Sequence, residues 1–183
     1  MNTYIALFRG INVGGNNMLP MKELKVVMEN EGCCDVQTYI QSGNVIFRSA
    51  MSDTAKLSKR LGTAVSKSHG FEPRVWLLTR QELERAAKAN PFHEAIENPK
   101  SVHLFFLATP PKAPNLEGID KIRLESERFQ LKGRVFYVHT PEGFGTSKLA
   151  TRVEQLLGVP ATARNWRTVT TLLEMSGKTK TSP

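Results

Sequence analysis

Two stretches of the sequence follow one plan: SGNVIFRSAMSDTAKLSKRL at residues 42–61 and KGRVFYVHTPEGFGTSKLATRV at residues 132–153. Each begins with a turn, continues as an apolar strand and leads into a helix. The helical parts also share letters, because TAKLSKRL at 54–61 aligns with TSKLATRV at 146–153. In both places a strand and a further helix follow. Internal similarity of this kind indicates an ancient duplication, so the sequence predicts two copies of one structural unit.

Reading outward from residues 42–61 gives the plan of the first copy. Pro20 is suited to the start of a helix and Gly32 to its end. Asp53 can cap a second helix, which Gly70 ends. The order is β-α-β-β-α-β, the ferredoxin-like arrangement. Its strands and helices are expected at residues 4–9, 20–31, 36–41, 44–49, 54–69 and 73–79.

The second copy repeats this order after a connecting helix, which the capping box from Thr79 to Glu82 starts and which runs to about Asn90. Its elements, with a closing helix, are expected at residues 102–108, 116–122, 126–131, 134–140, 146–158, 161–165 and 166–175. We predict an α+β protein with two tandem ferredoxin-like subdomains, residues 1–78 and 79–183, and a C-terminal helix. Packing one half against the other is the simplest way to bury the remaining apolar sheet surface.

Composition narrows the class of protein. The chain has 183 residues, 40% of them hydrophobic, and a formal net charge of +8. A packed core is therefore expected, and the positive charge either permits an anionic partner or serves solubility alone. Cys33 and Cys34 are adjacent, a spacing that strains a disulfide, and no suitably spaced histidines accompany them. We expect a cytoplasmic protein with no metal, no cofactor and no membrane span, since neither a signal peptide nor an apolar run of about 18 residues is visible.

The stretch GINVGGNN, residues 10–17, has the glycine spacing of a phosphate-binding P-loop. Asn16 and Asn17 stand where a P-loop has Lys and Ser or Thr, so ATP hydrolysis by this loop is not expected. Two interpretations stay open. The loop can bind an anion beside a helix start, or it is a turn that needs positive φ at Gly14, Gly15 and Asn16. The candidate anion-binding residues here are Arg9, Asn12, Gly14, Gly15 and Asn16.

A second glycine-rich loop, PEGFG at residues 141–145, also leads into a helix. Ser147 and Lys148 follow it and can hold an anion at the helix start, and here a lysine is present. The alternative is a simple N-cap and tight turn.

An RNA-binding interpretation rests on the second hairpin. KGRVFYVH resembles a motif of RNA-recognition domains, which stack bases on aromatic side chains of their central strands. Phe105, Lys132, Arg134 and Phe136 would share one sheet face, although Arg134 stands where an aromatic residue is expected. The alternative is that this face is buried.

Basic charge is concentrated in the helix expected at residues 54–69. It carries Lys56, Lys59, Arg60 and Lys67. Such a run is either a solvated helix face or a set of phosphate contacts.

Catalytic patterns are sparse. The four histidines show no paired ligand spacing, and Ser42 does not lie in a GxSxG motif. Whether the protein is an enzyme therefore stays open at this point.

Several unusual strings occur in a fixed order: RGINVGG at 9–15, TYIQSGNVIF at 38–47, SKL at 147–149 and TARNWRTV at 162–169. They resemble a widespread bacterial family of uncharacterised cytoplasmic proteins, known as a domain of unknown function. The resemblance implies a compact α+β protein and supplies no reaction. Family members often have Lys at the position of Asn16. The matching polar residues at strand ends and turns add further candidate ligand-binding residues, namely Ser42, Asn44, Arg164 and Asn165.

Three hypotheses follow. The first is a module that binds nucleic acid or a phosphorylated small molecule, through Arg9, Asn12 and the Gly14–Gly15 loop together with Lys148 and Arg164. The second is an enzyme with a site in the cleft between the two halves, using Arg9, Ser42 or Lys148. The third is a structural or partner-binding protein. The oligomeric state is left open.

Overall fold

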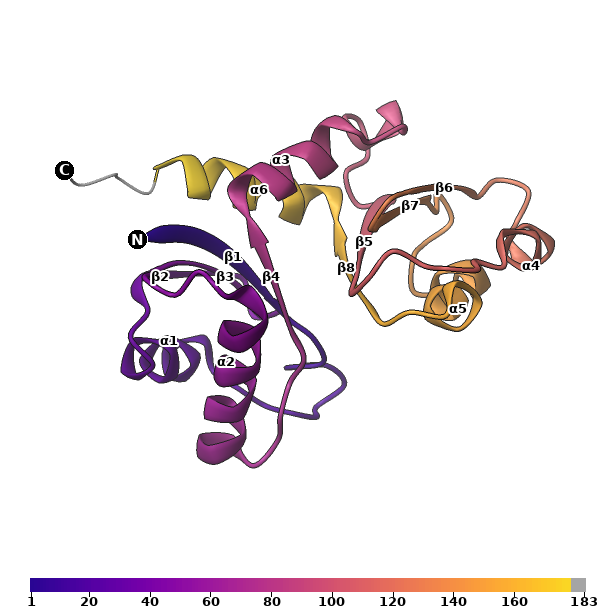
Figure 1. The fold of residues 1–183 in the computed structure, drawn as a ribbon. Helices are drawn as coiled ribbons and strands as arrows, with labels where there is room; N and C mark the ends of the chain where they lie inside the picture. The colour runs from indigo at the N-terminus through magenta and orange to yellow at the C-terminus, as the bar shows by residue number, and fades with distance from the viewer. Residues whose placement is uncertain (179–183) are drawn as a thin grey trace. The chain divides into compact units, whose positions relative to one another are not determined.

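The computed structural model describes residues 1–178; the last five residues of the second predicted subdomain lie outside the described residues. Within residues 1–178 the protein is an α+β fold with two four-stranded antiparallel sheets and six α-helices (Figure 1). The chain divides into two compact units. One comprises residues 1–84 and 171–178, and the other comprises Arg85–Thr170.

The first unit contains a sheet with the strand order β2-β3-β1-β4, in which all neighbouring strands are antiparallel. Two helices lie between its strands in the chain, which gives the β-α-β-β-α-β order expected from the sequence. The elements are β1 (Asn2–Phe8), α1 (Met21–Asn30), β2 (Cys34–Tyr39), β3 (Asn44–Ser49), α2 (Thr54–His69) and β4 (Val75–Thr79).

The second unit has the same order of elements and the corresponding strand order, β6-β7-β5-β8. Its elements are β5 (Val102–Leu107), α4 (Leu116–Ile122), β6 (Arg128–Lys132), β7 (Val135–His139), α5 (Lys148–Leu157) and β8 (Ala161–Asn165). Three further segments lie within residues 1–178, namely α3 (Arg80–Lys88), a 3-10 turn (His93–Ala95) and α6 (Trp166–Lys178).

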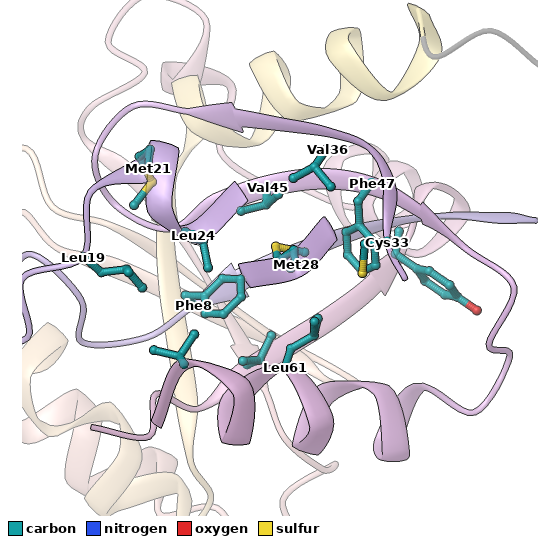
Figure 2. Close-up of a cluster of buried hydrophobic side chains, with 14 of the residues drawn as sticks. Phe8, Leu19, Met21, Leu24, Met28, Cys33, Val36, Val45, Phe47 and Leu61 are labelled. Carbon is teal, nitrogen blue, oxygen red and sulfur yellow. The ribbon is translucent and has the colours of Figure 1, made fainter. Parts of the chain in front are cut away.

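The core of the first unit lies between α1, α2 and one face of its sheet (Figure 2). Leu24 and Met28 recur at helical spacing on α1, as Leu57 and Leu61 do on α2, and all four are buried. They pack with Phe8 and its neighbours on the strands. Full burial of one such side chain contributes about 1.5–3 kcal/mol, so these two helix stripes fix α1 and α2 to the sheet.

The core of the second unit is built in the same way. Leu149 and Val153 of α5 and Ile119 of α4 pack against Phe105 and Phe136 of the sheet. The two phenylalanine rings meet edge to face, with centroids 6.2 Å apart. This aromatic pair therefore belongs to the interior of the unit.

The ends of α2 follow the sequence expectation. The Asp53 carboxylate accepts a hydrogen bond from the Lys56 backbone N–H at 3.0 Å, which satisfies one donor of the first turn. Gly70 has a φ of 77°, a left-handed conformation that favours glycine and ends the helix.

Candidate functional site

Asn12 holds the opening loop in shape. Its side-chain oxygen accepts a hydrogen bond from the Leu19 N–H at 2.7 Å, and its Nδ2 donates to the Leu19 and Gln41 carbonyls, each at 2.9 Å. Asn12 also has a φ of 54°, which asparagine tolerates better than most residues. Because both amide protons and the oxygen are engaged within the protein, the Asn12 side chain acts here as a structural brace.

The rest of this loop also bonds mainly to itself. The Asn17 Nδ2 donates to the Gly10 carbonyl at 2.9 Å, and the Asn16 Nδ2 lies 3.4 Å from the Gly14 carbonyl. Positive φ occurs at Gly14 and Gly15, as the turn interpretation expected. Asn17 also has a positive φ, whereas the turn interpretation expected this conformation at Asn16.

The structure brings the Ser42–Asn44 turn against the opening loop. The Phe8 N–H donates to the Gly43 carbonyl at 2.8 Å, and the buried Asn44 side chain donates to the Ser42 hydroxyl at 2.9 Å. A Cβ atom on Gly43 would lie 2.7 Å from the Cβ of Phe8, so only glycine fits there. The strings RGINVGG and QSGN are thus parts of one interlocked turn.

In the second unit, two of the residues predicted to bind a ligand cap helices instead. The Ser147 hydroxyl accepts from the Ala150 N–H at 3.0 Å, and the Asn165 side-chain oxygen accepts from the Thr168 N–H at 2.9 Å. Lys148, which follows the first cap, is exposed. These contacts match the N-cap alternative for this loop.

Arg164 is half-buried on β8. Its guanidinium donates to the Thr162 hydroxyl at 2.9 Å and to the Ala163 carbonyl at 2.8 Å. Removal of water around the group lowers the pKa of Arg164 to about 10. At neutral pH the side chain still carries its charge.

The proposed stacking platform for RNA is wrong in its geometry. Phe105 and Phe136 are buried beneath α5, so no base can reach their faces. Lys132 pairs with Val135 across the two-residue turn, whereas Phe136 pairs with Leu131, so Lys132 and Phe136 lie on opposite faces of the sheet.

The two basic residues of that platform bind backbone. The Lys132 ammonium donates to the Ala89 carbonyl at 2.7 Å and lies over the ring of Tyr137. The Arg134 guanidinium donates to the Leu107 and Ala108 carbonyls. Both side chains therefore have defined structural partners.

The basic residues of α2, in contrast, surround a surface hollow of about 290 Å³. All of its lining residues belong to the first unit, and six of the seven come from α2. The lining consists of Glu31, Lys56, Lys59, Arg60, Thr63, Ala64 and Lys67. Four cations here face one carboxylate, so the hollow is electropositive.

The cations of this basic hollow differ in their partners. Arg60 forms an ion pair with Glu31, and Lys56 lies 3.6 Å from the Asp53 carboxylate at the edge. Lys59 and Lys67 have no carboxylate partner among residues 1–178. The sequence identified the four cations, but it gave no sign that Glu31, beyond the end of α1, completes the hollow.

A second feature that the sequence did not indicate joins the ends of α1 and α2. The His69 ring contacts the Ser68 hydroxyl through Nδ1 at 2.7 Å and the Glu23 carboxylate through Nε2 at 2.8 Å. The Ser68 hydroxyl also donates to the Ala64 carbonyl at 3.0 Å. Because the serine proton is bonded to the helix backbone, this chain of contacts fastens α1 to α2 and lacks the arrangement of an activated nucleophile.

The described part of the chain holds no cluster of three or more His, Cys, Asp or Glu side chains placed to bind a metal ion. No helix within residues 1–178 is long and apolar enough to span a membrane.

Cys33 is buried and Cys34 half-buried, both as free thiols, and burial raises the pKa of Cys33 to about 11. Cys33 therefore stays protonated at neutral pH and is a poor nucleophile.

Comparison with known proteins gives a family and a structural neighbour. The family model described as "Protein of unknown function (DUF1697)" matches residues 1–137. The chain is also similar to the solved structure of a conserved bacterial protein, SP0830 from Streptococcus pneumoniae. The two share 26% sequence identity and a TM-score of 0.68, over 95% of this chain and 98% of that chain. No curated protein matches the chain.

Proposed function

This chain belongs to the DUF1697 family of unknown function, and we propose that it binds a phosphate-bearing ligand, nucleic acid or a phosphorylated small molecule, at the basic hollow on α2. One observation carries the proposal: four cationic side chains and one hydroxyl group line a single hollow of about 290 Å³. The comparison agrees with the sequence resemblance on the coarser point, a family of unknown function.

The charges in the hollow favour a bound anion. Lys59 and Lys67 are exposed and lack carboxylate partners in the described part of the chain, so a phosphate need not displace an acid to reach them. Thr63 lies between them and adds a neutral donor. Charge-assisted hydrogen bonds to phosphate are roughly twice as strong as neutral ones, which favours phosphates over uncharged ligands.

The glycine-rich loops are weaker candidates for the same role. Their asparagine side chains hold the loop together, and Ser147 and Asn165 cap helices. Each of these donors and acceptors would lose a protein partner on binding a ligand. Lys59 and Lys67 incur no such loss, and this difference supports moving the expected contacts from the loops to the helix.

The proposal is tested with the double variant Lys59→Gln/Lys67→Gln and the charge-matched control Lys100→Gln/Lys112→Gln. Pyrophosphate, ATP and a short oligonucleotide serve as probes in calorimetry and thermal unfolding. We expect the α2 variant to weaken binding by roughly tenfold, since each exposed charge contact is worth up to about 1 kcal/mol. The control should bind like the wild type. Equal binding by the α2 variant, or no binding of any probe at millimolar concentration, would overturn the proposal.

For the fold, we propose that the two units descend from one ferredoxin-like ancestor by duplication. The shared order of elements, the corresponding strand orders and the aligned strings at 54–61 and 146–153 support this. Superposing the strands of one unit on those of the other should bring these two helices into register. A best superposition that leaves them out of register contradicts the duplication.

A further inference from the structure

The cations of the basic hollow are spread along α2. Lys56 and Lys67 lie near opposite ends of the lining, and at a rise of 1.5 Å per residue they are about 16 Å apart along the helix axis. Lys59 and Arg60 lie between them. The hollow therefore presents a row of charges along the helix, not one cluster around a point.

A compact phosphate group cannot use such a row, because each of its oxygens reaches only the donors within hydrogen-bond distance. The distance of about 16 Å separates the helix backbone at Lys56 and Lys67, so a ligand that contacts all four cations at once is favoured when its negative charge repeats along that direction. One strand of a duplex places a phosphate every 3.4 Å along the axis and so presents about five phosphates over this length. The spacing of the cations thus suits a nucleic-acid backbone better than a single phosphorylated metabolite.

We infer that the α2 face binds the phosphate backbone of a nucleic acid without reading its base sequence, an inference that rests on the proposed anion binding at the same hollow. None of the seven lining residues is aromatic, so the hollow offers no platform for stacked bases. The aromatic pair of the second sheet, Phe105 and Phe136, is buried and cannot supply one. Binding then consists of phosphate contacts and is independent of base sequence.

Glu31 sets the strength of this contact. Its carboxylate pairs with Arg60 inside the hollow, so it occupies a guanidinium that a phosphate would otherwise bind. A backbone phosphate reaching Arg60 has to compete with Glu31 for it. Removal of the negative charge at residue 31 should therefore strengthen binding of nucleic acid, which is a gain that a damaged fold does not produce.

The test measures fluorescence anisotropy of two labelled duplexes, each of about 20 base pairs and unrelated in sequence, from about 50 to 200 mM salt. With three to four phosphate contacts, the slope of log K against log salt should be roughly −2.7 to −3.6, and equal for both duplexes. Lys59→Gln should make the slope less steep by about 0.9, and Glu31→Gln should make it steeper by a similar amount. Lys100→Gln should leave it unchanged.

Competition with pyrophosphate and ATP separates this inference from the broader proposal. If these compact anions bind the hollow as tightly as the duplexes, with a slope near −1, phosphate binding stands and the nucleic-acid inference fails. Binding to one duplex sequence only also contradicts it. If neither the compact anions nor the duplexes bind, the proposed function fails together with the inference.

Discussion

Helices α2 and α5 occupy the same place in the order of their units, and they differ mainly on their exposed sides. Each buries a leucine at the aligned position, Leu57 in α2 and Leu149 in α5, and each ends at a glycine in the left-handed conformation. On the exposed side, α2 carries four cations around a hollow, whereas α5 carries Lys148 and Arg152.

The comparison shows which part of a helix the fold determines. A buried stripe must fill the space above the sheet, so its residue types and spacing are restricted. An exposed side is bound by no such requirement, and it can gain charge at little cost in stability. The fold therefore does not require the additional cations on α2, which leaves them open to the contacts proposed above.

The largest effect is expected from truncating the buried leucines. Leu57→Ala and Leu149→Ala should each lower the free energy of unfolding by about 2–5 kcal/mol, because each leaves a cavity in a packed core. Urea denaturation measures both values. Similar losses support equivalent roles for the two helices, whereas a loss below about 1 kcal/mol in one unit would contradict them.

A second difference between the units concerns their histidines. His69 of the first unit is bonded to Glu23 and Ser68, while the Nδ1 atom of His103 in the second unit is buried without a hydrogen-bond partner in the described structure. His103 stacks on Phe144, with ring centroids 3.7 Å apart. Burial lowers the pKa of His103 to about 4, so the folded protein holds this ring neutral.

Stability should therefore fall as the pH drops from about 6.5 to about 4. In that window the unfolded chain binds a proton at residue 103 and the folded chain does not, which favours unfolding by up to about 3 kcal/mol at the acidic end. Substitution of the ring by His103→Phe should remove this part of the pH dependence, as measured by urea denaturation across the window. The exposed His93→Gln serves as the control, and an unchanged pH profile for His103→Phe would exclude the assignment.

The helix caps give a smaller effect, and one that differs between the units. Ser147 is buried, so Ser147→Ala leaves the Ala150 N–H without its partner and should cost about 1–2 kcal/mol. Asp53 is exposed to water, which can replace the lost hydrogen bond, so Asp53→Ala should cost less. Thermal unfolding of the two variants ranks them, and the reverse order would show that exposure does not control the strength of these caps.

The order of the helices and strands could be predicted from the sequence, because apolar spacing, caps and glycines are local signals. The faces of the second hairpin could not. Its turn contains two residues, and a shift of one residue moves every side chain to the other face of the sheet. The sequence placed this turn at residues 132–133, whereas it lies at residues 133–134. This shift is why Lys132 and Phe136 were wrongly placed together.

The candidate site was predictable only in part, for a similar reason. The cations of α2 repeat at helical spacing and are visible in the sequence. Glu31 comes from the end of a different helix, and the Asn12 contact to Gln41 joins two separate turns. Contacts between distant parts of the chain leave no local pattern, so the hollow and the interlocked loop emerged only from the fold.

The smallest effect on stability, and the sharpest test of the comparison, comes from the exposed sides of α2 and α5. Lys59→Gln and Arg152→Gln each remove one exposed charge, so both should change the free energy of unfolding by less than about 0.5 kcal/mol. Only Lys59→Gln should weaken binding of duplex DNA, because Arg152 lies in the other unit, outside the hollow. Equal weakening by the two variants would mean that net charge alone attracts the ligand, and the difference between the helices would then carry no functional meaning.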